Sequence, residues 1–296
     1  GLQVCHRAVV AGGFPENLFT CVKNPTIETA NTMFAHPDVP LLSITGGPGV
    51  VKAAMSTHKK VIAAGPGNPP VLVDETADID KAASDIIIGA SFDNNILCIA
   101  EKEAFVVESV FDKFMMAMER AGAAKIDDIC FKLLTEKTFV SDGKGGHVLN
   151  RELVGRSASH LADLVKVNIP EGTRLLFAET DKDNLFVCEE QMMPILPVVR
   201  VKDFDEGVKC CYEAELGYGH TALIHSKDMD RITEYARVMN TSIVVSNGYS
   251  TQGDGPDDGE AYLAFTIATP TGEGITSPRN FCRIRRLAIS GSLRFV

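Results

Sequence analysis

The sequence has no tryptophan, and its apolar runs stay well short of the about 18 residues that a membrane-spanning helix needs. Basic residues are few: 29 lysines and arginines stand against 39 aspartates and glutamates, and the net charge of −10 repels nucleic-acid phosphate. Eight cysteines are scattered without metal-ligand spacing, and the adjacent Cys210 and Cys211 suit neither a zinc site nor a redox CxxC motif. These absences argue against a membrane partner, a nucleic-acid partner and a metal site, and they favour reduced thiols.

The rest of the composition is that of an ordinary globular protein. The chain has 296 residues, of which 45% are hydrophobic, and this is enough for one large or two medium domains. Apolar segments of strand length alternate with helical segments, which predicts an α/β fold. Strands are predicted at residues 39–44, 61–64, 71–73, 104–107, 198–201, 221–225 and 242–245. Helices are predicted at 50–58, 79–90, 204–215 and 227–239, and a further one carries Phe111, Phe114, Met115 and Met118 at core spacing.

A glycine-rich turn follows the first predicted strand. Thr45, Gly46 and Gly47 lie between that strand and a helix, where backbone amides at the helix N-terminus suit a pyrophosphate. The sequence TGGPG is not the GxGxxG fingerprint, so a plain tight turn is the alternative.

Two other segments carry candidate chemistry. Cys98 ends a loop at residues 92–97, where a thiolate could attack a carbonyl, and a buried inert cysteine is the alternative. Glu189 and Glu190 precede an apolar run at 195–199, and an exposed acidic pair is the alternative there. Composition alone does not choose between these interpretations.

Two segments near the end of the chain have unusual charge. Asp254, Asp257, Asp258 and Glu260 crowd a glycine-rich loop, which could bind a cation or be a solvated surface loop. Residues 283–295 are rich in arginine and alternate as a strand would, which predicts an edge strand that pairs with another subunit.

The motifs occur together in an order that resembles the aldehyde dehydrogenase family. They are TGG at 45–47, GPGNPP at 65–70, FDNNILCIAEKE at 92–103, Glu189-Glu190, Met193-Pro194, GHTA at 219–222 and TPTGEG at 269–274. The resemblance is to the CoA-acylating branch, of the ethanolamine- and propanediol-utilisation type. It implies a catalytic α/β domain at 66–265, the C-terminal part of a Rossmann-like nucleotide domain at 1–65, and a return segment with an oligomerisation strand at 266–296.

The resemblance also implies roles for individual residues. Cys98 matches the nucleophile that attacks the aldehyde and carries the thioester, with its own backbone N–H holding part of the oxyanion. Glu190 matches the residue that holds the nicotinamide ribose of NAD, and Thr45, Gly46 and Gly47 match the turn against its pyrophosphate. His220 is expected to handle coenzyme A or substrate, and a structural histidine is the alternative.

One departure from hydrolytic members of the family is informative. Aligning their general-base segment on residues 65–70 puts Ala64 where those enzymes carry a glutamate. Alanine cannot activate water by taking a proton, so the acyl-enzyme should survive until the more acidic thiol of coenzyme A attacks it. The sequence therefore favours acyl transfer over hydrolysis, with a short aldehyde of the acetaldehyde or propionaldehyde class as substrate.

Other features of the family are not found in the chain. An upstream βα unit and an asparagine of the oxyanion hole have no counterpart here, so we expect an N-terminally truncated chain with weak NAD binding and negligible turnover. The resemblance implies a homo-oligomer in the cytoplasm, with a bacterial microcompartment and its shell proteins as an open alternative. A glutamyl-phosphate-reductase-like enzyme and a non-catalytic scaffold are the rival functions.

Overall fold

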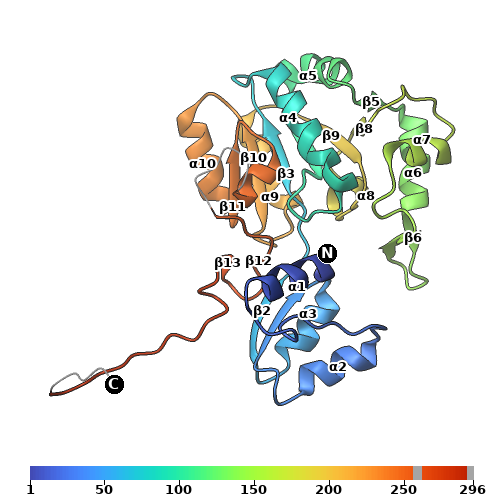
Figure 1. Cartoon of the computed structure of the whole chain (residues 1–296). Coiled ribbons are helices and arrows are strands. Elements are labelled where there is room, and N and C mark those ends of the chain that lie inside the picture. The colour runs from blue at the N-terminus through green and yellow to red at the C-terminus, as the bar shows by residue number, and fades with distance from the viewer. Residues whose placement is uncertain (256–261, 292–296) are drawn as a thin grey trace.

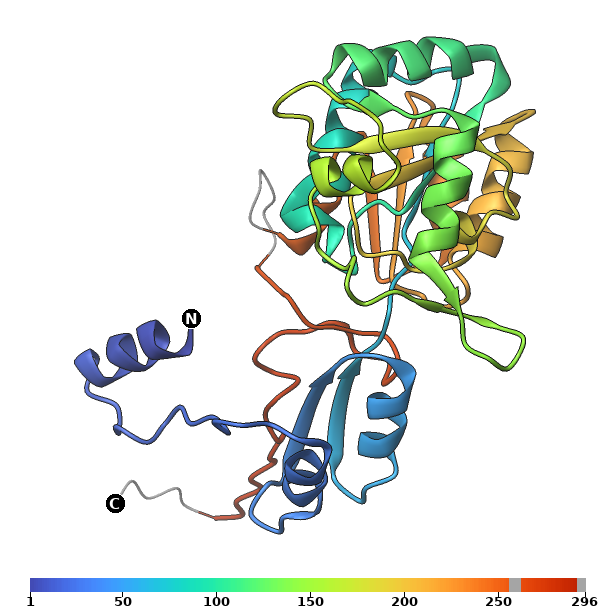
Figure 2. The same cartoon turned by 90° about the vertical axis from the view of Figure 1, so that its right-hand side faces the viewer.

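The computed structural model describes residues 1–255 and 262–291. Figures 1 and 2 show two bodies, a small one formed by the start of the chain and a large one built around a parallel sheet. One strand-to-strand connection at residues 65–69 links them, and the end of the chain returns from the large body to the small one. Within the described residues, no helix is long and apolar enough to cross a membrane.

The small body is a βαβ unit with two further helices. It contains α1 (Leu2–Ala11), α2 (Ile27–Ala35), β1 (Leu41–Thr45), α3 (Pro48–Met55) and β2 (Lys60–Ala64). β1 and β2 pair in parallel, and α3 is the crossover that a parallel pair needs. Thr26 caps α2 through a reciprocal capping box with Thr29. Neither α1 nor α2 has a buried residue.

The large body is a seven-stranded sheet with strand order β11-β10-β3-β4-β9-β8-β5, and all of its strand pairs are parallel. Its strands are β3 (Pro70–Val73), β4 (Glu103–Val107), β5 (Ala124–Lys125), β8 (Leu176–Thr180), β9 (Ile195–Val201), β10 (Thr221–His225) and β11 (Ile243–Ser246). Its helices are α4 (Ile79–Ser91), α5 (Glu108–Arg120), α6 (Asp128–Thr138), α7 (Ala158–Leu164), α8 (Leu185–Cys188), α9 (Phe204–Ala214) and α10 (Met229–Met239). The predicted α/β fold is confirmed.

Helices cover both faces of this sheet, as a parallel sheet requires. α4 and α5 pack on one face, and α9 and α10 pack on the other (Figures 1 and 2). The predicted stripe of α5 is buried in the core at all four positions, so that prediction is confirmed. Helices α2, α6, α7 and α8, the sheet strands β5 and β8, and the two-stranded pairs near residues 139–149 and 267–275 were not predicted from the sequence.

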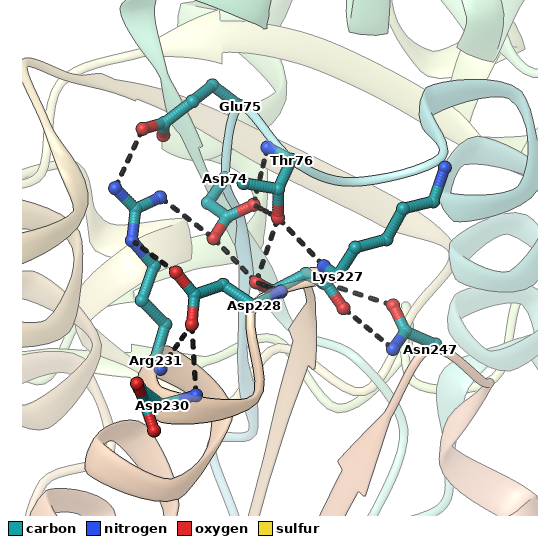
Figure 3. A network of polar contacts seen from close by, with 9 residues as sticks. Asp74, Glu75, Thr76, Lys227, Asp228, Asp230, Arg231 and Asn247 are labelled. Atoms are coloured by element: carbon teal, nitrogen blue, oxygen red, sulfur yellow. Dashed lines mark hydrogen bonds and ion pairs between the residues drawn. The ribbon is translucent and has the colours of Figure 1, made fainter.

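The carboxyl edge of the sheet is closed by a polar network (Figure 3). Asp74 follows β3, and its carboxylate accepts hydrogen bonds from the Thr76 hydroxyl (2.6 Å), the Ser226 hydroxyl (2.6 Å) and the Arg231 guanidinium (3.1 Å). The Asn247 side chain both donates to and accepts from the backbone of Ser226. These bonds join the ends of β3, β10 and β11, so this edge is tied together by side chains.

Short elements complete the chain. They are the hairpin of β6 (Phe139–Ser141) and β7 (His147–Leu149), the antiparallel pair of β12 (Ile267–Ala268) and β13 (Gly274–Ile275), and the 3₁₀ turns η1 (Phe92–Asn95) and η2 (Ser250–Asp254). Residues 283–291 form no strand within the chain, and 292–296 lie outside the described residues, so the predicted intersubunit strand stays a prediction. Asp257, Asp258 and Glu260 of the acidic loop also lie outside them, and no metal-ligand cluster occurs in the described part.

Candidate active site

The residues predicted to act in the large body meet at the amino edge of its sheet. Cys98 precedes β4, Glu190 precedes β9 and His220 immediately precedes β10. Gly67, just before β3, touches all three. Its N–H donates to Glu190 Oε1 (3.3 Å), and a Cβ at this position would lie 2.3 Å from the Cys98 carbonyl oxygen and 3.1 Å from His220 Cγ. The residue must therefore be a glycine for the three groups to approach one another.

The loop that carries Cys98 has an unusual backbone. Asp93, Asn94 and Asn95 adopt positive φ angles of 46°, 51° and 62° in succession. Aspartate and asparagine are the side chains that tolerate this left-handed region best, which explains the local sequence DNN. Asn95 is buried and holds the turn, since its amide donates to the carbonyls of Ala90 (2.8 Å) and Glu101 (2.9 Å).

Cys98 is half-buried, and its charge state depends on its neighbours. Burial, followed by the nearby Glu190 carboxylate, raises the pKa of Cys98 to about 11, while the positive charge of Lys102 acts in the opposite direction. The thiol is thus mostly protonated at neutral pH in the resting structure. Attack on a carbonyl requires the thiolate, so the site needs a group or an event that stabilises it.

Glu190 lies beside the nucleophile with one oxygen on the Gly67 N–H. Burial raises the pKa of Glu190, and both Lys102 and that N–H counteract part of the effect. The structure leaves Glu190 half-buried, and its other carboxylate oxygen could accept from a ligand hydroxyl. This placement fits the predicted ribose contact.

His220 is fully buried at the same edge. Its Nδ1 lies 2.9 Å from the Thr221 hydroxyl, and its Nε2 has no hydrogen-bond partner among the described residues. Burial, and then the charge of Lys102, lowers the pKa of His220 to about 4, so the ring is neutral at neutral pH. A neutral imidazole with an unpaired nitrogen can give or take a proton, which is consistent with substrate handling.

The glycine turn of the small body is open. Thr45 ends β1, and Gly47 is the N-cap of α3 without a side-chain cap. A Cβ at Gly46 would lie 2.8 Å from Val50 Cγ1, whereas at Gly47 and Gly49 it would meet no described atom within 4 Å. Bare backbone at a helix N-terminus fits a pyrophosphate, so Gly47 and Gly49 are the positions at which NAD could approach.

Two further residues lie at this site. Lys102, inside the 92–103 motif, has no role predicted from the sequence and is fully buried beside Cys98. Asp254 was expected in a cation-binding or solvated surface loop, but its side chain is buried, and burial raises its pKa to about 6. A lysine between two glutamates at the start of a buried apolar run was the available signal, since buried charges need a reason.

Comparison with known proteins supports the resemblance. The family model described as "Aldehyde dehydrogenase family" matches residues 2–130 and 173–256. The chain is 45% identical over 297 residues to acetaldehyde dehydrogenase (acetylating) EutE from Salmonella typhimurium, covering all of this chain and 63% of that protein. It is 46% identical to propanal dehydrogenase (CoA-propanoylating) of the same organism, covering 93% of this chain and 58% of that protein.

Solved structures give the same result. Propionaldehyde dehydrogenase from Rhodopseudomonas palustris with bound propionyl-CoA superposes with a TM-score of 0.89 at 43% identity, covering 94% of this chain and 61% of that one. The enzyme from the Clostridium phytofermentans fucose utilisation bacterial microcompartment gives 0.92 at 42% identity, with 99% and 66% covered. The chain thus spans about 63% of the length of EutE, the curated relative named above. The family match covers more than half of the chain, and the chain therefore belongs to the aldehyde dehydrogenase family.

Proposed function

We propose that this chain supplies the chemistry of a CoA-acylating aldehyde dehydrogenase, which converts a short aldehyde, NAD and coenzyme A reversibly into acyl-CoA and NADH. The observation that carries the proposal is the meeting of Cys98, Glu190 and His220 around Gly67. The similar proteins named above include acetylating and CoA-propanoylating enzymes, and one related structure holds bound CoA with an acylated cysteine. The two rival functions gain no support from these relatives.

The protein's own groups account for the covalent steps. The Cys98 thiolate attacks the aldehyde carbon, a C–S bond forms, and the Cys98 N–H is available to the developing oxyanion. Glu190 and the glycine turn would hold NAD, which would supply the acceptor for the hydride of this carbon. A thioester on Cys98 remains. The thiol of coenzyme A then attacks the thioester carbon, the bond to Cys98 breaks, the proton of that thiol passes to the displaced Cys98 sulfur, and acyl-CoA leaves.

Ala64 supports transfer to a thiol rather than to water. It ends β2 with a fully buried methyl group, and it offers no oxygen to deprotonate a water molecule. The adjoining TPTGEG stretch packs here, since the Thr271 hydroxyl accepts from the Ala63 N–H (3.0 Å) and donates to Glu273. The Glu273 carboxylate therefore already accepts a hydrogen bond from the Thr271 hydroxyl.

The organisation of the whole protein is also part of the proposal. We assign residues 1–65 to part of a nucleotide-binding domain, 66–265 to the catalytic domain, and 266–296 to a return segment with an oligomerisation strand. Ile284 and Leu287 are 96% and 79% exposed, which supports burial against another copy of the chain. The Clostridium phytofermentans relative belongs to a microcompartment, which supports a cytoplasmic or shell-enclosed location.

The acyl-transfer half-reaction tests the proposal without NAD. The 296-residue chain is incubated with propionyl-CoA or acetyl-CoA, and the adduct is located by mass spectrometry. We expect the acyl group on Cys98, release of free CoA, and no adduct in Cys98→Ser. Hydrolysis to the free acid as the main outcome would contradict the role assigned to Ala64. Calorimetric titration with NAD tests the expected weak binding, and micromolar affinity would contradict it.

A further inference from the structure

Lys102 has a complete set of partners on the nucleophile loop. Its side chain is fully buried, and its ammonium donates to Asn95 O (2.9 Å), Asn95 Oδ1 (2.5 Å) and Leu97 O (3.2 Å). An ammonium has three N–H donors, and here each one has an acceptor. The geometry therefore fits the charged form of the lysine.

The charge of this ammonium has no direct counter-ion. No carboxylate in the described part of the chain lies within ion-pair distance of it, although a buried charge normally needs one. Burial lowers the pKa of Lys102 to about 8, and Glu190, Cys98, Glu103 and Glu101 act in the opposite direction, in that order. The groups that favour its charge most strongly are thus the two principal residues of the active site.

The backbone of Lys102 joins the loops of the site. Its N–H donates to the carbonyl of Pro69 (3.0 Å), in the segment of Gly67, and its carbonyl accepts from the Gln191 side chain (2.8 Å), next to Glu190. One residue therefore connects the loops that carry Gly67, Cys98 and Glu190.

We propose that Lys102 is a positioning residue, whose ammonium holds the left-handed 93–95 turn and supplies the positive charge that stabilises the Cys98 thiolate, in competition with Glu190. This inference rests on the proposed function, in which Cys98 attacks as a thiolate. Of the groups that interact with Cys98, Glu190 and Asp254 disfavour the anion and Lys102 favours it. His220 is neutral and adds no charge. A ligand that hydrogen-bonds to the Glu190 carboxylate would weaken the repulsion between that carboxylate and the Cys98 thiolate. The attraction between the Lys102 ammonium and the thiolate would then dominate.

The rate at which iodoacetamide alkylates Cys98, measured against pH and resolved by peptide mass spectrometry, tests the inference. We expect Lys102→Gln to slow alkylation about tenfold at pH 7, where the Lys102 ammonium of the unmodified chain is charged, and to change the rate little well above its pKa of about 8, where that lysine is neutral. Lys102→Arg keeps the charge and should restore the rate at pH 7. Glu190→Gln should raise that rate. Lys81→Gln, on α4 and paired with Asp85, is the matched control and should not change it.

Each result decides the inference. A folded Lys102→Gln variant that is alkylated at pH 7 as fast as the unmodified chain would overturn it, because a purely structural lysine would not set the reactivity of the thiol. If Lys102→Gln does not fold, the pH profile of the unmodified chain decides, and a rate that rises through pH 8 without a break, although Lys102 loses its charge there, overturns the inference. The acyl-CoA experiment keeps the two proposals apart: slower alkylation in Lys102→Gln, with no acylation of Cys98 in the unmodified chain, retains the role of the lysine and rejects the enzyme function.

Discussion

The two edges of the seven-stranded sheet are built from similar polar residues but in opposite ways. At the carboxyl edge, Arg231 pairs with Asp74 (3.1 Å) and Glu75 (2.8 Å), and the hydrogen bond that it donates to Glu75 raises the Arg231 pKa (Figure 3). At the amino edge, Lys102 has no ion pair in the described residues, and burial lowers its pKa. The charge of Arg231 is neutralised by the carboxylates of Asp74 and Glu75, whereas no carboxylate in the described residues forms an ion pair with Lys102.

The same difference applies to the uncharged and acidic groups. Buried atoms without a hydrogen-bond partner among the described residues include His220 Nε2, Asn68 Oδ1, Gln191 Oε1 and both carboxylate oxygens of Glu103, all at or beside the amino edge. Parallel sheets usually bind ligands at their carboxyl edge. Here the carboxyl edge is closed by its own bonds apart from the buried His225 Nε2, and more of the unpaired buried atoms lie at the opposite edge, where Cys98 is.

The largest effect is expected when the nucleophile at the amino edge, Cys98, is replaced. Cys98→Ser should abolish acylation by propionyl-CoA, because a serine hydroxyl ionises far less readily than a thiol and is a much weaker nucleophile. The adduct is measured by intact mass, and thermal unfolding checks that the fold is kept. An acyl group retained on the serine variant would reject Cys98 as the acceptor.

The next largest effect is expected when the polar network at the carboxyl edge is disrupted. Asp74→Ala removes a fully buried carboxylate and leaves Arg231 and the Ser226 hydroxyl short of a partner, so we expect a loss of about 3 kcal/mol in the free energy of unfolding. Urea unfolding measures this loss. The rate at which iodoacetamide alkylates Cys98 at pH 7 should stay unchanged in the folded variant. A changed rate would show that the two edges are coupled.

Two separate glycine-to-alanine substitutions test the close approach at Gly67 through the rate of acylation. Gly67→Ala places a methyl group 2.3 Å from the Cys98 carbonyl oxygen, so the nucleophile loop must shift, and we expect acylation to slow about 100-fold. Gly1→Ala is the control, since its Cβ would meet no described atom within 4 Å and the residue lies outside the site. Equal rates of acylation in the two variants would contradict the close approach at Gly67.

The smallest expected effect concerns Asp254. Its folded pKa of about 6 lies above the ordinary value of 3.8, so its stabilising contribution is present below 3.8 and is lost as the pH rises through 6. Asp254→Asn should remove this part of the pH dependence of thermal unfolding. It should also speed alkylation of Cys98 by about threefold at neutral pH, because a carboxylate near the thiol is lost. Slower alkylation would reverse the assigned sign.

Local patterns predicted much of this molecule. The buried stripe of α5 and the bounds of β10 follow from periodicity and from an apolar run, and the strained turn was expected as a loop. The motifs also indicated Cys98 as the candidate nucleophile. The amino-edge contacts were not predictable, because Asn68 bonds to the carbonyls of Val187 and Ala214, more than a hundred residues away. Lys102 was missed for another reason: its partners Asn95 and Leu97 are close in sequence, but only the left-handed turn at 93–95 brings their oxygens to its ammonium.

The closing contacts of the small body have a consequence for the order of folding. The Ala63 N–H bonds to Thr271, 208 residues later, and the Lys60 ammonium donates to the carbonyls of Asn280 and Cys282. The whole seven-stranded sheet lies between these partners in the sequence. Because distant contacts form late, we expect the sheet to become protected from proteolysis first and residues 41–64 last, as pulse proteolysis during refolding would measure. Strands β1 and β2 would then wait for residues 271–282 before they are fully held.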